Sequence, residues 1–206
     1  REAFAWLSVR ECFIGIAPAT VMGVSFSGEL AYEIHVPNAS LYAAYLALLN
    51  AGEARGLKIF GARAVESMRM EKGFLHWKAD IITEFDPFET GLDRFVKLEK
   101  GEFIGKAALL KRQSEGQRKK LVTLEIDTTT APAHGGASLM SGDKVVGTIT
   151  SGDWGHRVGM NLAYGFVDPA QSATGSEMEL DLCGTIVKAT VIGSSPYDPD
   201  FQRMRA

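Results

Sequence analysis

The chain has 206 residues, of which 46% are hydrophobic and 23% are charged, proportions that are ordinary for a globular protein. This length can bury one large core or two modest ones. The net charge of -3 excludes a general basic field that would attract nucleic acid or an anionic membrane. No apolar run approaches the ~20 residues of a membrane-spanning helix, and no signal peptide is recognisable.

The two cysteines, Cys12 and Cys183, lie far apart in the sequence and form no C-x-x-C pair. We therefore expect free thiols in a reducing compartment, such as the bacterial cytoplasm or the mitochondrial matrix. Because position 1 is Arg rather than Met, we also expect the chain to be part of a longer protein.

The first 60 residues alternate between strand-like and helix-like patterns. Ser8 is placed to cap a short helical stretch over residues 9–13. Two β-branched and apolar segments, 20–27 and 31–36, flank a glycine-containing turn and predict a β-hairpin. The next helix begins after Asn38, and its apolar stripe consists of Leu41, Tyr45, Leu48 and Leu49.

A second helix is predicted from residue 62, with an apolar face next to a charged one. The apolar residues recur every three positions, at Ala62, Val65 and Met68. The neighbouring face carries Arg63, Glu66 and Arg69, so ion pairs along the helix are available. Gly73 can adopt the left-handed conformation that ends such a helix, because it has no Cβ.

The turn after this helix contains Trp77 and Asp80, and a charged helix followed by an aromatic turn suggests the wall of a pocket. A further short helix is predicted from Lys106. The polar segment RQSEGQRKK is the clearest linker in the chain, and it predicts a domain boundary near Gly116, between residues 1–115 and 116–206.

After this boundary the sequence predicts a small all-β barrel or sandwich of roughly 85 residues. Val122, Leu124 and Ile126 alternate with polar positions and should share the inner face of a strand. Short strands with turns between them follow, over residues 139–140, 145–149, 162–167, 178–182 and 186–192.

Several common chemistries are excluded by missing motifs. The chain has no G-x-G-x-x-G dinucleotide loop, no phosphate-binding P-loop and no G-x-S-x-G nucleophile elbow. Its four histidines have neither metal-ligand spacing nor cysteine companions, so a zinc site is not expected: His35, His76, His134 and His156.

Three residues remain as candidates for ligand binding, each with an alternative interpretation. Glu33, on a predicted strand, could accept two hydrogen bonds from a flat heterocycle such as an aminopyrimidine, or it could be an ordinary exposed glutamate. Arg63 could bind a ligand carboxylate or pair with Glu66. Trp77 could stack on a ring or fill the core.

Several longer motifs follow one another along the chain: SFSGELAYEIHVP, GARAVESMRMEKGFLHWKADI, FETGLDRFVKL, EFIGKAALL, HGGASLM, VVGTITSGDWGHRVGMNLAYGFV and the terminal SPYDPDFQRMRA. In this order they make the chain similar to the folate-binding aminomethyltransferases, of which the T-protein of the glycine cleavage system is the type member. The resemblance covers nearly the whole chain and is strongest to the C-terminal parts of dimethylglycine and sarcosine dehydrogenases. It implies an α+β chain: the end of a partial ferredoxin-like folate domain, then a C-terminal β-barrel.

The resemblance also implies roles for four residues. Glu33 matches the glutamate that binds the amino-pyrimidine edge of the pterin, and Arg63 matches the arginine near the benzoyl-glutamate side of folate. Trp77 holds the position of an aromatic residue beside the cofactor, and Tyr197 matches a tyrosine that lines the same channel. Three positions depart from residues that are common in the family: Phe26, Ala31 and Lys78.

The function implied is that of the tetrahydrofolate-binding, one-carbon-transferring part of an FAD-dependent N-methyl amine dehydrogenase. The FAD would bind a domain of the parent protein outside this chain, and the family's catalytic aspartate also lies outside it, so the chain alone should be inert. Its expected partners are folate, a methylated amine and that flavin domain, with no nucleic acid or membrane. The alternatives are a stand-alone aminomethyltransferase, working with a lipoyl carrier protein, and a non-enzymatic folate-binding module.

Overall fold

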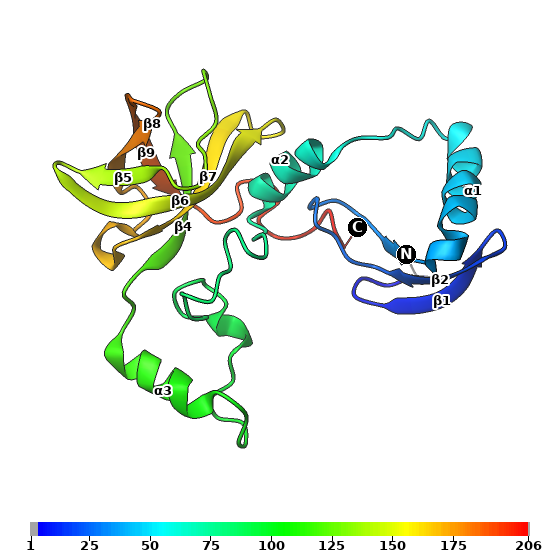
Figure 1. Cartoon of the computed structure of the whole chain (residues 1–206), viewed down its shortest axis with the longest axis horizontal. Coiled ribbons are helices and arrows are strands. Elements are labelled where there is room, and N and C mark those ends of the chain that lie inside the picture. The colour runs from blue at the N-terminus through cyan, green and yellow to red at the C-terminus, as the bar shows by residue number, and fades with distance from the viewer. Residues whose placement is uncertain (1–3, 206) are drawn as a thin grey trace. The chain divides into compact units, whose positions relative to one another are not determined.

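The computed structural model describes residues 4–205 and combines α-helices, a small sheet and a closed β-barrel, which confirms the predicted α+β class (Figure 1). It divides into two compact units. Within the described residues, unit 1 contains 4–68 and 198–205, and unit 2 contains 69–197. The predicted domain boundary near Gly116 stays a prediction. No described helix is long and apolar enough to cross a membrane.

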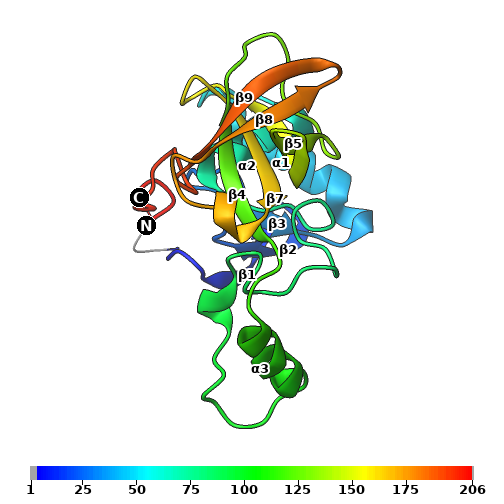
Figure 2. The same cartoon turned by 90° about the vertical axis from the view of Figure 1, so that its left-hand side faces the viewer.

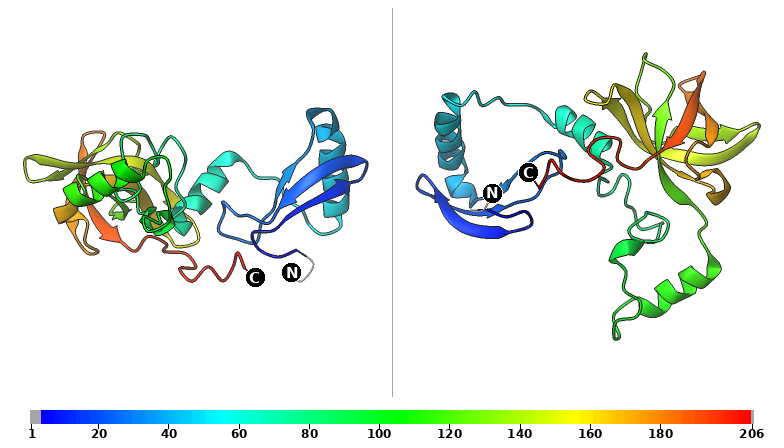
Figure 3. Two further views of the ribbon diagram at one scale, coloured as in Figure 1. Left: turned by 90° about the horizontal axis from the view of Figure 1, so that it is seen from below. Right: turned by 180° about the vertical axis from the view of Figure 1, so that it is seen from behind.

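Unit 1 is built on a three-stranded antiparallel sheet in the order β1-β2-β3. The strands are β1 (Val9–Ile14), β2 (Ala17–Met22) and β3 (Glu33–His35). A 3-10 turn, η1 (Asn38–Ser40), leads into α1 (Leu41–Glu53), and α2 (Ala62–Lys72) follows. Helix α1 lies along one face of the sheet (Figure 3), where Ala44 of the helix and Ala17 of β2 are both buried.

Two predictions for this part of the chain are wrong in detail. Residues 9–13 form strand β1 and not a helix, because β2 satisfies their backbone groups across the sheet; Ser8 donates its hydroxyl to the Ala5 carbonyl instead of capping. The two strands of the predicted hairpin, β2 and β3, do pair. However, β2 ends at Met22 and β3 begins at Glu33, so an irregular segment and not a short turn connects them.

The predicted apolar stripe of α1 is also not buried among the described residues. Leu41, Tyr45 and Leu48 are exposed by 58%, 45% and 39%. The periodicity correctly predicted the helix, but periodicity alone does not say which apolar face finds a partner.

Unit 2 contains a closed antiparallel barrel in the strand order β4-β7-β6-β5-β8-β9, with β9 pairing back onto β4 (Figures 1 and 2). Closure leaves no free edge strand, which removes a common route to aggregation. The strands are β4 (Lys120–Ile126), β5 (Ser138–Ser141), β6 (Lys144–Gly155), β7 (Met160–Val167), β8 (Glu177–Leu182) and β9 (Thr185–Ile192).

The barrel interior follows the alternation in the sequence. On β4 the predicted inward residues Val122, Leu124 and Ile126 are all buried in the main core, and β8 alternates exposed and buried along its whole length. Gly152 on β6 is required by close approach, since a Cβ there would lie 2.3 Å from the Ala133 carbonyl oxygen.

The end of α2 packs on the outside of this barrel. Met70 joins Leu162 and Tyr164 of β7 in a second core cluster. Gly73 ends the helix with φ +78°, as predicted, and a Cβ there would lie 2.1 Å from the Ser194 carbonyl oxygen. The remaining elements of unit 2 are η2 (Asp93–Phe95), α3 (Lys106–Glu115) and η3 (Pro169–Gln171).

Replacing Leu180 by Ala should destabilise unit 2 by about 2–5 kcal/mol, because Leu180 is fully buried inside the barrel. The matched control is Ile186→Ala on the neighbouring strand, which is 58% exposed and should change the free energy of unfolding by no more than about 0.5 kcal/mol. Chemical denaturation measures both. Equal losses in the two variants would contradict the assignment of Leu180 to the core.

Candidate functional site

The four predicted ligand-binding residues are divided between the two units. Glu33 lies on β3 and Arg63 in the first turn of α2, both in unit 1; Trp77 and Tyr197 lie in unit 2. Each unit therefore contains only two of the four residues, and their assembly into one site stays a prediction.

Glu33 and Arg63 are accessible to a ligand within their unit. The Glu33 carboxylate lies 3.5 Å from Nε2 of His35, and more than half of its side chain is exposed. Arg63 is exposed as well. An exposed carboxylate keeps lone pairs available for the donors of a heterocycle, and an exposed guanidinium can pair with a carboxylate.

Trp77 is 64% exposed, so its ring is a surface platform and does not fill the core. It lies in the turn between α2 and the barrel and forms an isolated bridge with Ile81. Lys78, the next residue, has φ +70°, a left-handed conformation that glycine adopts without cost. The family resemblance leads us to expect glycine here, and Lys78 maintains the turn at an energetic cost of order 1 kcal/mol.

The turn that carries Trp77 is held by a buried ion pair. Nη1 of Arg69 donates to Oδ2 of Asp80 at 2.7 Å, and both side chains are fully buried. The same carboxyl oxygen accepts the backbone N–H of His76 at 2.8 Å, and Arg69 also donates to the Phe74 carbonyl at 3.0 Å. Both ends of the turn are therefore tied to one carboxylate and one guanidinium.

The second oxygen of Asp80 ties this turn to the barrel. Oδ1 accepts the hydroxyl protons of Thr150 at 2.5 Å and of Ser151 at 2.6 Å, both on β6. The sequence placed Arg69 among ion pairs along the helix and left Asp80 without a role. The partner lies eleven residues beyond Arg69, outside the reach of helical spacing.

Tyr197 is positioned by a second buried carboxylate, that of Glu71. Glu71 pairs with the Arg157 guanidinium and also accepts the backbone N–H of Val158 at 3.2 Å. The Arg157 guanidinium lies 3.8 Å from the centre of the Tyr197 ring, a cation–π contact. The Tyr197 N–H donates to the Glu71 carbonyl at 3.0 Å, so ring and backbone are both fixed.

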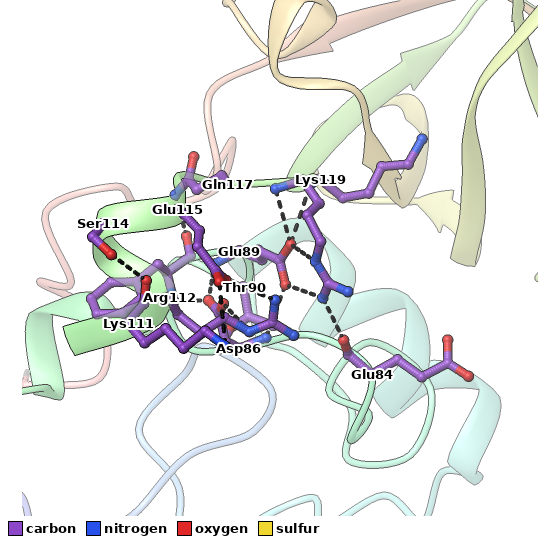
Figure 4. Close-up of polar contacts among 12 residues, drawn as sticks. Glu84, Asp86, Glu89, Thr90, Lys111, Arg112, Ser114, Glu115, Gln117 and Lys119 are labelled. Carbon is purple, nitrogen blue, oxygen red and sulfur yellow. Dashed lines mark hydrogen bonds and ion pairs between the residues drawn. The ribbon is translucent and has the colours of Figure 1, made fainter. Parts of the chain in front are cut away.

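A third buried carboxylate, that of Glu89, anchors the linker that precedes the barrel (Figure 4). Its oxygens accept the backbone N–H groups of Asp86, Arg118 and Lys119 at 3.1 to 3.3 Å. The Arg118 guanidinium adds two hydrogen bonds at 3.0 and 3.1 Å. Arg118 and Lys119, at the end of the predicted linker, are thus bound to the Glu89 carboxylate.

Hydrogen bonds around the linker shift the pKa values of three groups: Glu89, Arg118 and Asp168. Burial raises the pKa of Glu89, but the hydrogen bonds from Arg118 and the nearby backbone outweigh burial and hold its pKa below the ordinary glutamate value. The hydrogen bond to Glu89 raises the pKa of Arg118. The hydrogen bond from Lys119 lowers the pKa of Asp168.

A cleft of about 580 Å³ opens on the barrel at the end of β4. Asn161, which lines it, donates to the carbonyls of Thr128 and Ala131 at 3.1 and 2.8 Å, so its buried Oδ1 faces away from both and has no partner within the described residues. The cleft is polar and lies within unit 2. Neither Trp77 nor Tyr197 lines it.

Across residues 4–205, no group of three or more His, Cys, Asp and Glu side chains is placed to hold a metal ion. Both cysteines are free and exposed.

Asp80→Ala should cost about 3–5 kcal/mol of unfolding free energy, because it removes the carboxylate from a fully buried guanidinium. The exposed Asp127→Ala is the control and should change stability by no more than about 0.5 kcal/mol. Urea denaturation compares the two variants. A loss below about 1 kcal/mol for Asp80→Ala would contradict the proposed importance of the pair.

Glu89→Gln should destabilise the chain by about 1–3 kcal/mol at pH 7, since an amide cannot accept all the donors that surround this carboxylate. A pKa lowered by folding stabilises the protein above the unfolded-state pKa, and this stabilisation is lost as the pH falls through the folded-state pKa. The difference between wild type and variant should therefore shrink below about pH 5. Unfolding measured from pH 7 to pH 3 tests this; a gap that widens on acidification would refute it.

Two family profiles match the sequence and together cover most of it. The GCVT N-terminal domain matches residues 1–100, and the glycine cleavage T-protein C-terminal barrel domain matches residues 119–198. The second match coincides with the closed barrel seen in the structure.

Relatives of two kinds are similar to this chain. Human mitochondrial dimethylglycine dehydrogenase is 33% identical over 93% of this chain and 22% of its own length, and mouse mitochondrial sarcosine dehydrogenase is 35% identical over 88% and 21%. The aminomethyltransferase of Alkaliphilus oremlandii is 31% identical over 91% of this chain and 51% of its own length. The chain thus spans about a fifth of these dehydrogenases and about half of the aminomethyltransferase.

A solved structure has the same fold. The crystal structure of the glycine cleavage system aminomethyltransferase T from Bartonella henselae superposes with a TM-score of 0.84 and 25% identity, covering all of this chain and 55% of that one. With both profiles matched in order and the barrel present, the chain belongs to the glycine cleavage T-protein family.

Proposed function

We propose that this chain is the tetrahydrofolate-binding, one-carbon-accepting part of an FAD-dependent N-methyl amine dehydrogenase of the dimethylglycine or sarcosine type. The observation that carries the proposal is the match of 93% of the chain to 22% of human dimethylglycine dehydrogenase, in a chain whose fold is that of an aminomethyltransferase. The parent protein would act in the bacterial cytoplasm or the mitochondrial matrix.

The residues of this chain fit a folate in chemical type. Glu33 offers an exposed carboxylate for the donor edge of the pterin, and Arg63 offers an exposed guanidinium for the glutamate tail. Trp77 offers an exposed ring for stacking, on a turn that the Arg69–Asp80 pair keeps rigid. Tyr197 is fixed in place by Glu71 and Arg157.

The folate would supply the amine that captures a one-carbon unit from the oxidised substrate. The contribution of this chain would be to bind and orient that cofactor, so that its amine is held next to the imine produced by the flavin domain. The sequence of this chain holds no dinucleotide loop for FAD, so the flavin would bind elsewhere in the parent protein.

The second candidate is a stand-alone aminomethyltransferase that works with a lipoyl carrier protein. The 31% identity to an aminomethyltransferase over 91% of this chain favours it.

Measurements of turnover separate the candidates. The full-length dehydrogenase should oxidise dimethylglycine or sarcosine on a bound flavin, and added tetrahydrofolate should convert released formaldehyde into methylenetetrahydrofolate. A full-length protein without flavin that needs a lipoyl carrier would favour the second candidate, and folate binding without turnover in either assay would favour a non-enzymatic module.

In the full-length protein, tetrahydrofolate should change the fluorescence of Trp77, and Glu33→Gln should weaken binding by about 1–3 kcal/mol because one acceptor oxygen becomes a donor. Glu11→Gln on β1, also exposed, is the matched control and should leave the affinity unchanged. Fluorescence titration compares the two variants with wild type. An unchanged affinity in Glu33→Gln would remove Glu33 from the site.

A further inference from the structure

A cysteine and a histidine from different turns of the barrel meet at its surface. Sγ of Cys183 lies 3.4 Å from Nε2 of His134, and both side chains are exposed. Cys183 is in the two-residue turn between β8 and β9, with φ +53°. The turn is closed by Asp181, whose Oδ1 accepts the Gly184 N–H at 2.7 Å, so the thiol is presented from a defined position.

The contacts of His134 determine which ring nitrogen can accept a proton. Nδ1 lies 3.2 Å from the carbonyl oxygen of Gly135. A carbonyl oxygen only accepts hydrogen bonds, so Nδ1 carries the hydrogen and the neutral ring keeps its lone pair on Nε2. That lone pair faces Sγ of Cys183, so the thiol donates to the imidazole. A nucleophile in hydrogen-bond contact with a base held by a third group is the arrangement that activates a thiol.

The other cysteine of the chain provides a natural comparison. Cys12 lies on β1, opposite Ala19 of β2, and it is also exposed and free. Within residues 4–205, no histidine is hydrogen-bonded to the Cys12 thiol. The two thiols therefore share exposure and differ in the presence of a base.

We propose that Cys183, with His134 as its base, is a site of thiol–disulfide exchange with low-molecular-weight disulfides. His134 Nε2 takes the Sγ proton, and the thiolate attacks one sulfur of the small disulfide. A new Sγ–S bond forms as the old S–S bond breaks, and the leaving thiolate receives the proton back from His134. Cys183 ends as a mixed disulfide, and half of the reagent is released as a thiol.

This site is independent of the proposed folate site. Neither Cys183 nor His134 is among the residues assigned to folate, and the exchange needs neither the cofactor nor the flavin domain. A failure of the folate assignment would leave this proposal standing, and the reverse is also true.

The test treats the intact protein, reduced and at pH 7, with dithiodipyridine, a neutral disulfide that the Asp181 carboxylate does not repel. Peptide-resolved mass spectrometry follows Cys183 and Cys12 in the same sample. Cys183 should react about tenfold faster than Cys12. In urea, where the histidine contact is lost, the two rates should become equal.

Two variants separate base catalysis from simple access. His134→Gln and His134→Ala should both slow Cys183 by about fivefold or more, although Ala makes the thiol more accessible. His156→Gln, an exposed histidine on the same barrel, is the control and should leave both rates unchanged. Thermal melting verifies that each variant is folded. Native rates for Cys183 and Cys12 within twofold of each other, or a folded His134→Ala variant as reactive as wild type, would overturn the proposal.

Discussion

The structure of unit 2 depends on the ion pair between Arg69 and Asp80, in which both side chains are fully buried. Removing two charges from water costs several kcal/mol per ion, and the cost is recovered only when every lone pair and proton finds a good partner. Asp80 meets that condition, because its two oxygens accept from Arg69, His76, Thr150 and Ser151. The pair thereby joins the end of α2, the Trp77 turn and strand β6.

Two further buried carboxylates in this unit also hold distant segments of the chain together. Glu71 fixes the turn at Arg157 and the backbone of Tyr197, and Glu89 fixes the approach to β4 through Arg118. In each case a buried carboxylate gathers backbone N–H groups and a guanidinium from distant parts of the chain. An apolar contact could hold these segments together, but directional hydrogen bonds also define their geometry. Precise geometry would matter for the proposed stacking of a flat ligand on the exposed ring of Trp77.

The sequence predicted what local periodicity controls and missed what distant pairing controls. The alternation of β4 has a period of two, and its inward residues Val122, Leu124 and Ile126 are buried as expected. Residues 9–13 were expected to be helical, yet they form a strand because β2 pairs with them. Likewise, Arg69 was placed correctly on its helix, but its partner could not be found from helical spacing.

The sequence pattern was equally limited in identifying the residues of the candidate site. Glu33 and Trp77 are residues of suitable type in accessible positions, yet their assignment to folate comes from the family resemblance and not from a pattern that requires it. The buried carboxylates Asp80 and Glu71, which position Trp77 and Tyr197, carried no signal of their own in the sequence. A lone acidic residue in a turn has many structural explanations, and only its contacts choose among them.

The two units differ in how completely they pair their strand edges and bury their apolar side chains. The barrel closes, so all six strands have partners on both sides, and its core is continuous. The sheet of unit 1 ends at β1 and β3, and large apolar side chains such as Phe13, Ile16 and Tyr42 are more than 70% exposed. Exposed apolar groups of this size are costly unless something covers them. Within residues 4–205, unit 1 therefore presents an exposed apolar surface, whereas the barrel contains its own core.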